Sequence, residues 1–284
     1  MSLASSYPVA LVCSALGLRR SSYYYRPRGR EEEAVRAALL KEAEVWPRYG
    51  YRRLGQELRR KGWVVNAKRV RRLMRQMGLQ VKRKARKPTT TNSRHGLARF
   101  PNLIRGLSVT RPDQVWAADV TYVRLRREWV YLAVILDVYT RGIRGWHLSR
   151  SLDQELTWVA LEKALARNAP EIHHSDQGVQ YAASPYVERL RAAQVKVSMA
   201  DVGQPTQNPH AERVIRTIKE EEIELSEYEN FEDAHAQIGH FIEQVYMHKR
   251  IHSALGYLTP AEFEARSGLP RRPQARPSHQ GRAI

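Results

Sequence analysis

The sequence contains a single cysteine, Cys13, among 284 residues. One cysteine excludes an internal disulfide framework and any zinc finger built on paired cysteines. Long apolar runs are also missing, since no stretch approaches the ~20 residues that a membrane-spanning helix needs. The apolar part of residues 1–18 precedes Arg19 and Arg20 instead of following a basic segment, so a signal peptide is not expected. These absences fit a protein of a reducing compartment with no membrane partner.

Acidic residues are scarce in the first part of the chain. Residues 1–105 contain 26 Lys and Arg but only 6 Asp and Glu, whereas residues 106–284 contain 22 and 23. The formal net charge of +19 therefore comes entirely from the N-terminal part. The positive charges stand in blocks with interleaved aromatic residues, so we expect this part to contact a nucleic acid. The alternative is a generally basic, soluble protein.

Helical patterns occupy the basic part. Residues 8–16 predict an apolar helix that Gly17 ends, and a polar, aromatic segment follows. Residues 1–28 thus form either a small helix-turn-helix-like segment or a simple packing helix. Residues 30–80 predict three further helices, separated by Pro47 and Gly62, and we expect them to form a helical DNA-binding domain. Their ranges are 31–46, 49–63 and 66–79.

The third of these helices has two different faces. Asn66 can cap its start, and Val70, Leu73, Met74 and Met77 have the spacing of core residues. A basic outer face after a short turn suits insertion into the major groove, although a solvated surface helix is the alternative. The second helix and the basic linker at 81–108 add further cations that can contact phosphates. The candidate DNA contacts are Arg52, Arg53, Lys68, Arg69, Arg71, Arg72, Arg75, Lys82, Arg83 and Lys84.

The pattern changes at about residue 109, where strands begin to alternate with helices. This order is typical of an α/β layer structure. Two further helices form a C-terminal extension at 227–268, and the Pro- and Arg-rich tail at 269–284 is expected to be disordered. The predicted strands are 114–123, 129–139, 142–149, 171–176 and 195–199. The predicted helices are 153–168, 184–194, 209–225, 231–250 and 259–267, the last one capped by Thr259.

Three acidic residues occupy positions where their side chains can converge. Asp119 lies within an apolar strand, where a carboxylate is costly to bury unless it is paired or bound to a metal. Asp176 ends another strand, and Glu212 lies in the first turn of the long helix at 209–225. Such hard oxygen ligands suit Mg²⁺ or Mn²⁺, and two ions ~4 Å apart can assist phosphoryl transfer. For each acid alone, an ion pair or a helix cap is the alternative.

The segments around these acids resemble the D, D and E motifs of retroviral-integrase-like transposases. They read WAADVTYV at 116–123, HHSDQGVQY at 173–181 and NPHAERVIRTIKEEE at 208–222, with thirty-five residues between Asp176 and Glu212. Further matches are YGYRRL at 49–54, VNAKRVRRLMRQMGL at 65–79 and HSALGYLTPAEF at 252–263. Together they are similar to the second-frame product of bacterial transposases of the insertion-sequence-three family.

The resemblance implies an α/β ribonuclease-H-like catalytic core at 109–226, a mixed sheet flanked by helices. N-terminal all-α helix-turn-helix modules and C-terminal helices would surround it. It implies that Asp119, Asp176 and Glu212 are the catalytic residues and the ligands of Mg²⁺ or Mn²⁺, with two ions. The implied reaction is DNA strand cleavage and strand transfer at the terminal inverted repeats of an insertion sequence.

The resemblance also implies partners and a location. Double-stranded DNA would be bound both as element ends and as target, by a homo-oligomer that is at least a dimer. A first-frame product, separate or fused by frameshift, would be a further partner, because this chain shows no leucine-zipper heptad of its own. The expected location is the bacterial cytoplasm, with association to the nucleoid through DNA.

Arg216 and Lys219 follow Glu212 by four and seven residues, so all three share one helical face that would meet the DNA. An ion pair of Arg216 with Glu220 is the alternative. The chain departs from the family at Met247 and Ile251, where family members usually carry Asn and Pro. Two other functions stay open: a catalytically inactive regulator that binds element ends, and a metal-dependent nuclease on the same fold.

Overall fold

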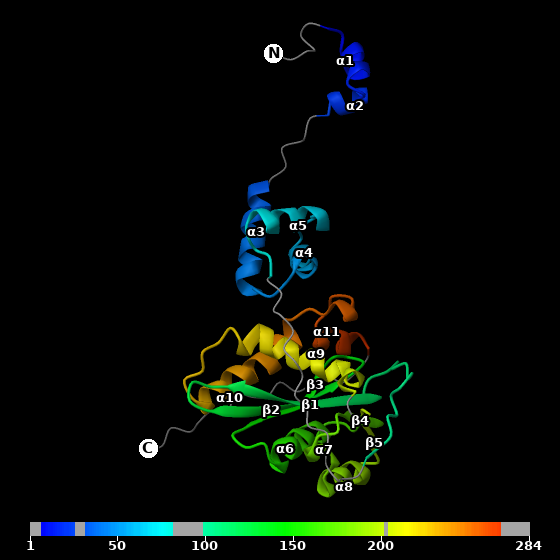
Figure 1. The fold of residues 1–284 in the computed structure, drawn as a ribbon, viewed down its shortest axis with the longest axis vertical. Coiled ribbons are helices and arrows are strands. Elements are labelled where there is room, and N and C mark those ends of the chain that lie inside the picture. Colours follow the sequence, from blue (N-terminus) through cyan, green and yellow to red (C-terminus); the bar gives the residue numbers. More distant parts are fainter. Residues whose placement is uncertain (1–6, 26–31, 82–98, 202–203, 268–284) are drawn as a thin grey trace.

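The computed structural model describes residues 7–25, 32–81, 99–201 and 204–267. Helices α1 (Val9–Ala15) and α2 (Arg20–Tyr23) lie at one end of the molecule, apart from the rest (Figure 1). Gly17 adopts a positive φ of 62° directly after α1, as its place in the sequence predicted. No helix in these described ranges is long and apolar enough to cross a membrane.

A helical unit follows, made of α3 (Glu32–Val45), α4 (Tyr51–Arg60) and α5 (Ala67–Gln76). Its core contains the predicted apolar positions of α4 and α5, with Leu54, Leu58 and Leu73 fully buried. The Asn66 side chain caps α5 by accepting a hydrogen bond of 2.8 Å from the Lys68 amide. The three predicted helices are therefore present. The chain divisions at residues 28, 80, 108, 226 and 268 remain predictions.

The α/β part is built on one mixed sheet of five strands in the order β3-β2-β1-β4-β5. β1 (Val115–Arg124), β2 (Trp129–Asp137) and β3 (Ile143–Ser149) are antiparallel neighbours. β4 (Ile172–Ser175) and β5 (Lys196–Met199) extend the sheet in parallel with β1. All five predicted strands are present, each within two residues of its predicted ends.

Helices cover both faces of the sheet (Figure 1). One face packs against α6 (Gln154–Leu165), α7 (Val179–Ala182) and α8 (Ser184–Ala192). The other packs against α9 (Pro209–Ile218) and α10 (Phe231–His240). β3 lies so close to α6 that a Cβ added at Gly145 would stand 2.1 Å from the carbonyl oxygen of Ala160. Sequence reasoning missed the short helix α7.

Two predicted helices are continuous over nearly their predicted ranges but change helix type part-way. The helix predicted at 209–225 is α9 followed by a π-helical turn, η3 (Lys219–Ile223). The helix predicted at 231–250 is α10 followed by a second π-helical segment, η4 (Phe241–Tyr246). Apolar periodicity continues through such segments, so it did not reveal the change of helix type.

Short segments complete the fold. η2 (Pro205–Gln207) precedes α9, and η5 (Ser253–Leu255) precedes α11 (Pro260–Arg266). Thr259 caps α11 in a reciprocal capping box with Glu262, as predicted. Most of the predicted linker, residues 82–98, and the predicted disordered tail from residue 269 lie outside the described residues.

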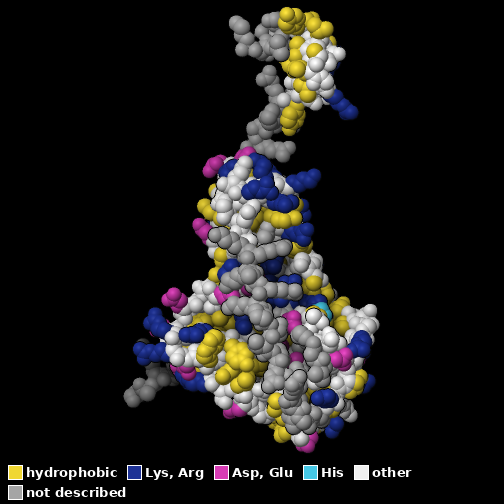
Figure 2. Space-filling view, in the orientation of Figure 1, with side chains coloured by type: hydrophobic (Ala, Val, Ile, Leu, Met, Phe, Trp, Pro, Cys, Tyr) yellow, Lys and Arg dark blue, Asp and Glu magenta, His cyan; other side chains and the backbone are white. Residues whose placement is uncertain are grey.

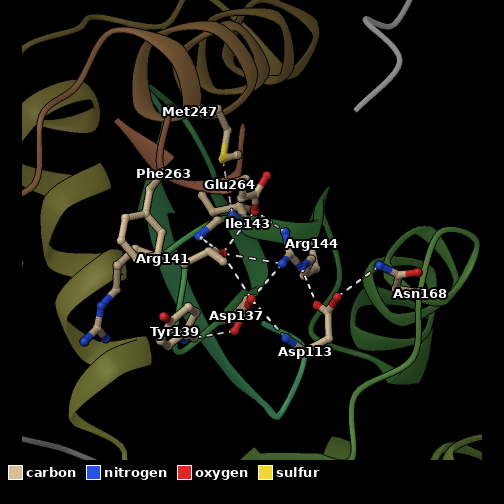
Figure 3. Close-up of polar contacts among 12 residues, drawn as sticks. Asp113, Asp137, Tyr139, Arg141, Ile143, Arg144, Asn168, Met247, Phe263 and Glu264 are labelled. Carbon is tan, nitrogen blue, oxygen red and sulfur yellow. Dashed lines mark hydrogen bonds and ion pairs between the residues drawn. The ribbon is translucent and has the colours of Figure 1, made fainter. Parts of the chain in front are cut away.

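An ionic cluster around Arg144 fastens α11 to the sheet (Figure 3). The guanidinium of this β3 residue binds Asp113 at 2.8 Å, Asp137 at 2.7 Å and also Glu264 of α11. Asp137 is fully buried, which raises its pKa, and the charge of Arg144 opposes that rise. Burying a carboxylate is tolerated here because its oxygens also accept hydrogen bonds from Tyr139 and Thr140.

The helical unit contacts the C-terminal part of the chain. Ile251 is fully buried in the core of the helical unit, and its amide donates to the hydroxyl of Tyr49 at 3.0 Å. Arg60 binds Glu262, and Arg53 binds Glu221 at 3.1 Å. Both apolar and ionic contacts therefore hold α3–α5 beside η3 and α11.

Candidate active site

Asp119 lies on the face of β1 that α9 covers. Ala117, two residues earlier, packs in the same core as Ala211 and Val214 of α9, whereas Ala118 packs on the opposite face. Side chains alternate along a strand, so Asp119 shares the α9-facing side with Ala117. One of its carboxylate oxygens accepts a hydrogen bond of 2.8 Å from the Val120 amide.

Asp176 follows directly after β4. The parallel register pairs Trp116 with His173 and Ala117 with His174. Continuing it by two residues brings Asp176, just past the end of β4, alongside Asp119 in the middle of β1. The Asp176 carboxylate accepts a hydrogen bond of 3.0 Å from the Gly178 amide, which fixes the turn that leads into α7.

Glu212 lies in the first turn of α9, as predicted, and is half-buried. Asn208, the residue before the helix, fixes this end of α9 on the sheet. Its side-chain amide donates to the carbonyl of Ala118 at 2.9 Å, immediately before Asp119. The start of α9 is therefore attached to the strand that carries the first carboxylate.

Electrostatics places the three carboxylates in one neighbourhood. The pKa of Asp119 is raised to about 7, first by burial, then by the negative charge of Asp176 and, more weakly, by that of Glu212. The charge of Lys219 acts in the opposite direction on the pKa of Asp119. Like charges that face one another in a partly buried site favour either a proton or a cation between them.

The carboxylates do not form a closed metal cage by themselves. Within the described ranges, no three His, Cys, Asp or Glu side chains are gathered closely enough to hold a metal ion. The assignment of Asp119, Asp176 and Glu212 as metal ligands therefore stays a prediction. The donor set still fits Mg²⁺, which retains waters and binds proteins through one or two carboxylates together with substrate phosphates.

Sequence reasoning missed three side chains of this region. Asn208 was not singled out, nor was Tyr181, whose buried hydroxyl has no hydrogen-bond partner among the described residues and whose pKa is raised by burial and by neighbouring Tyr186, Asp119 and Asp176. The third is His174. Its ring bonds the Ser198 hydroxyl at 2.9 Å and the Gln207 carbonyl at 3.2 Å, so it ties β4 to β5 and to the segment before α9.

Comparison with known proteins gives the family. Models described as integrase core domain match residues 109–205 and 193–260, and one described as HTH-like domain matches residues 30–87. The uncharacterized 31 kDa protein of insertion element IS600 from Shigella sonnei is 37% identical over 89% of this chain and 97% of its own length. Transposase InsF for insertion sequence IS3A from Escherichia coli is 31% identical over 92% and 95%.

The chain belongs to the insertion-sequence transposases. It is therefore a transposase that acts in DNA transposition, with DNA as its partner and an integrase-type, ribonuclease-H-like core. Among solved structures, the HTLV-2 integrase catalytic core domain in complex with magnesium is 16% identical, with a TM-score of 0.45 over 54% of this chain and 96% of that one. The assignment rests on the sequence relatives and the family models, not on that likeness.

Arg216 and Lys219 of the transposase lie on α9 and on the first residue of η3. Arg216 is exposed, and in the described part of the chain it forms no ion pair with Glu220. The intrahelical salt bridge considered as the alternative is therefore absent from this structure. The influence of Lys219 on the pKa of Asp119 shows that its charge lies near the carboxylates.

Lys and Arg side chains stand on the surface of the helical unit (Figure 2). The predicted DNA-contacting residues differ in exposure. Arg52, Lys68, Arg71 and Arg75 are exposed, and so is Arg72, although it pairs with Glu32 at 3.0 Å. Two expectations need correction. Arg69 is half-buried, and one of its guanidinium nitrogens is buried with no hydrogen-bond partner among the described residues.

The second correction concerns Arg53. Its guanidinium lies 4.6 Å from the ring centre of Tyr49 and binds Glu221, so it joins the helical unit to η3 instead of standing free for DNA. Lys82, Arg83 and Lys84 lie outside the described residues.

Proposed function

We propose that Asp119, Asp176 and Glu212 hold two divalent cations, Mg²⁺ or Mn²⁺, and catalyse DNA strand cleavage and strand transfer at the ends of an insertion sequence. The observation that carries this proposal is the raised pKa of Asp119, caused by burial and by the charges of the other two carboxylates. A cation among them would relieve this repulsion. Oxygen donors of this kind favour Mg²⁺ and Mn²⁺ over softer metals.

The bound ions would supply charge neutralisation at the phosphodiester and activation of the attacking oxygen. In the first step, a water oxygen attacks phosphorus at the element end, the bond to the 3′ oxygen breaks, and that oxygen receives a proton. In the second, the freed 3′-hydroxyl attacks another phosphodiester, so one P–O bond forms and one breaks. The three carboxylates orient these groups, and no Ser or Tyr nucleophile is required.

The cations around the carboxylates support a role in holding DNA. Arg216 and Lys219 are proposed to contact the DNA end that the carboxylates process, since they extend from the same helical surface as Glu212. The exposed cations of α5 are proposed to enter the major groove. Arg52, exposed on α4, would add a phosphate contact.

Strand transfer of an element needs two DNA ends in one complex, so we propose that the chain acts as a homo-oligomer, at least a dimer, on DNA. A first-frame product is proposed as a further partner, either separate or fused. Light scattering of the purified chain with and without duplex ends measures its oligomeric state. A DNA complex that contains one protein chain would contradict it.

The decisive experiment incubates the purified full chain and Mg²⁺ with a labelled duplex that carries the terminal repeat. Wild type should produce a cleaved strand and a joined product. Asp119→Asn, Asp176→Asn and Glu212→Gln should lose both products and retain DNA binding. Glu188→Gln is the matched control, because Glu188 is exposed on α8, on the opposite face of the sheet.

The same assay separates the alternatives. Binding without any cleavage by wild type would identify an inactive regulator of element ends. Cleavage that is never followed by joining would identify a nuclease on the same fold. Products that persist in Glu212→Gln would remove Glu212 from the site.

A further inference from the structure

A basic cavity of about 330 Å³ is lined by α9, the helix that carries Glu212, where this helix meets the helical unit. Its walls come from α9 and η3, the turn between β2 and β3, the segment after η4, and α4. Five arginines line it: Arg53, Arg141, Arg213, Arg216 and Arg250. Two Glu line it as well, so the formal net charge of its lining is +3.

Two of these arginines share one carboxylate. Glu221 binds Arg53 at 3.1 Å and Arg250 at 2.6 and 2.7 Å on the side of the cavity that α4 lines. The remaining three, Arg141, Arg213 and Arg216, form no ion pair with any described residue. The second acid of the cavity, Glu220, forms no described ion pair either, so positive charge is in excess.

Arg141 is held in place although no described carboxylate pairs with it. Its φ is +61°, a strained value for an arginine, and the hydroxyl of Tyr246 donates to its carbonyl oxygen at 3.0 Å. Its half-buried guanidinium contacts Nδ1 of His210 at the start of α9.

A half-buried guanidinium that meets no described carboxylate is incompletely compensated. A strained backbone that persists in such a place indicates that the surrounding structure is built to present this side chain. An anion that enters the cavity would meet the guanidinium of Arg141 without rearranging the backbone.

The arrangement of α9 relates the cavity to the carboxylates. Successive residues turn by roughly 100° around an α-helix, so Arg216 lies between Glu212 on one side and Arg213 on the other. Arg216 therefore borders both the carboxylate site and the cavity. A strand whose scissile phosphate lies at Glu212 would carry a neighbouring phosphate toward Arg213 and Arg141.

We propose that this cavity binds one backbone phosphate of the DNA strand, a few nucleotides from the phosphodiester that the carboxylates process. Guanidinium groups match phosphate oxygens in charge and in fork geometry, which makes arginine the favoured residue for such contacts. The inference rests on the proposed function, because it assigns the substrate of the same site. Arg213 and Arg141 are its main ligands, and His210 orients Arg141.

The test measures binding of the full chain to a fluorescent duplex with the terminal repeat, in the absence of metal, between about 50 and 200 mM salt. Arg213→Gln should weaken binding about tenfold and lower the slope of log affinity against log salt by about one. The matched control is Arg167→Gln, which removes an exposed arginine after α6, on the opposite face of the sheet. The slope of log affinity against log salt for Arg167→Gln should equal that of wild type.

A second measurement locates the phosphate. Duplexes with a single neutral methylphosphonate are compared at each backbone position near the element end. At one position the replacement should weaken wild type about as much as Arg213→Gln does, and it should not weaken Arg213→Gln further. Arg141→Gln should show the same coupling, and its thermal melting reveals any loss of folding. Coupling at no position, or an unchanged slope in Arg213→Gln, would overturn the proposal.

These outcomes are separable from the proposed function. Strand transfer by wild type together with an unchanged slope in Arg213→Gln removes the phosphate site and leaves the function. Coupled binding in a chain that never cleaves or joins DNA removes the function and leaves the phosphate site.

Discussion

The hydroxyl of Tyr49 accepts a hydrogen bond of 3.0 Å from the backbone amide of Ile251 and thereby joins the helical unit to a segment 202 positions later. Both residues are buried, and the Tyr49 ring stacks on Trp46 with 4.7 Å between centroids. Burial raises the pKa of Tyr49 to about 12, so the hydroxyl stays protonated at neutral pH. A proline in place of Ile251 has no amide hydrogen and could not make this bond.

Tyr49→Phe should lower the free energy of unfolding by about 1–3 kcal/mol, because it leaves the buried amide of Ile251 without a partner. Urea unfolding at neutral pH measures the change. Tyr122→Phe is the matched control, since Tyr122 is 54% exposed and should be within about 0.5 kcal/mol of wild type. Equal stabilities of the two variants would show that the bond contributes nothing to the attachment.

Gly145→Ala should destabilise the core by about 1–3 kcal/mol, because the new methyl group would stand 2.1 Å from the Ala160 carbonyl and force α6 away from β3. Thermal melting measures it. Gly55→Ala in α4 provides the contrast, since its methyl group would meet only the Val70 side chain at 3.7 Å. That substitution should be neutral or stabilising by up to about 1 kcal/mol. The same sign for both variants would contradict the close approach of α6.

Acidification should destabilise the protein through His173. Burial lowers its pKa to about 3, whereas an unfolded histidine has a pKa of about 6.5. Between these values only the unfolded chain binds the proton, so stability is full above about pH 6.5 and falls by about 1.4 kcal/mol per pH unit below it. His173→Gln should remove this contribution from the slope measured between about pH 7 and pH 5.

The difference in pH-dependent stability between wild type and His173→Gln isolates the contribution of His173. Asp119, with its pKa raised to about 7, changes stability in the opposite direction over part of this range, but it is present in both. The other buried histidines are common to both as well. Parallel pH profiles for wild type and His173→Gln would contradict the prediction.

The affinity of the transposase for DNA should fall steeply with salt, because residues 1–105 carry 26 of its Lys and Arg. Replacing Lys68, Arg71 and Arg75 together by Gln should lower the salt slope by about three if each contacts one phosphate. Fluorescence anisotropy measures it. An unchanged slope would place the DNA on another surface of the helical unit.

Local sequence patterns were sufficient for the elements that are regular and apolar. Segments rich in strand-forming residues marked the five strands, and the positions of Gly17 and Thr259 correctly indicated where helices end or begin. These features follow from short-range rules of backbone conformation and capping. The positions of Asp119, Asp176 and Glu212 on strand, strand end and helix start were likewise predictable.

Contacts between residues far apart in the sequence were not predictable in this way. Arg53 has the appearance of a DNA-binding cation until Glu221, 168 positions later, is placed beside it. The ion pair of Arg144 with Glu264 of α11 was not predictable from the sequence either. The orientation of Asn208 toward the Ala118 carbonyl also depends on packing of α9 against the sheet, which no periodicity encodes.

The attachment of the helical unit to the rest of the transposase bears on where the DNA is cut. Tyr49, Arg53 and Arg60 hold α4 through a hydrogen bond and two ion pairs to Ile251, Glu221 and Glu262. If α5 is fixed in this way, it stands at a constant distance from the carboxylates. The number of base pairs between the bases that α5 reads and the phosphodiester at Glu212 would then be set by protein packing, and shifting the recognition sequence along the DNA would move the cut by the same number.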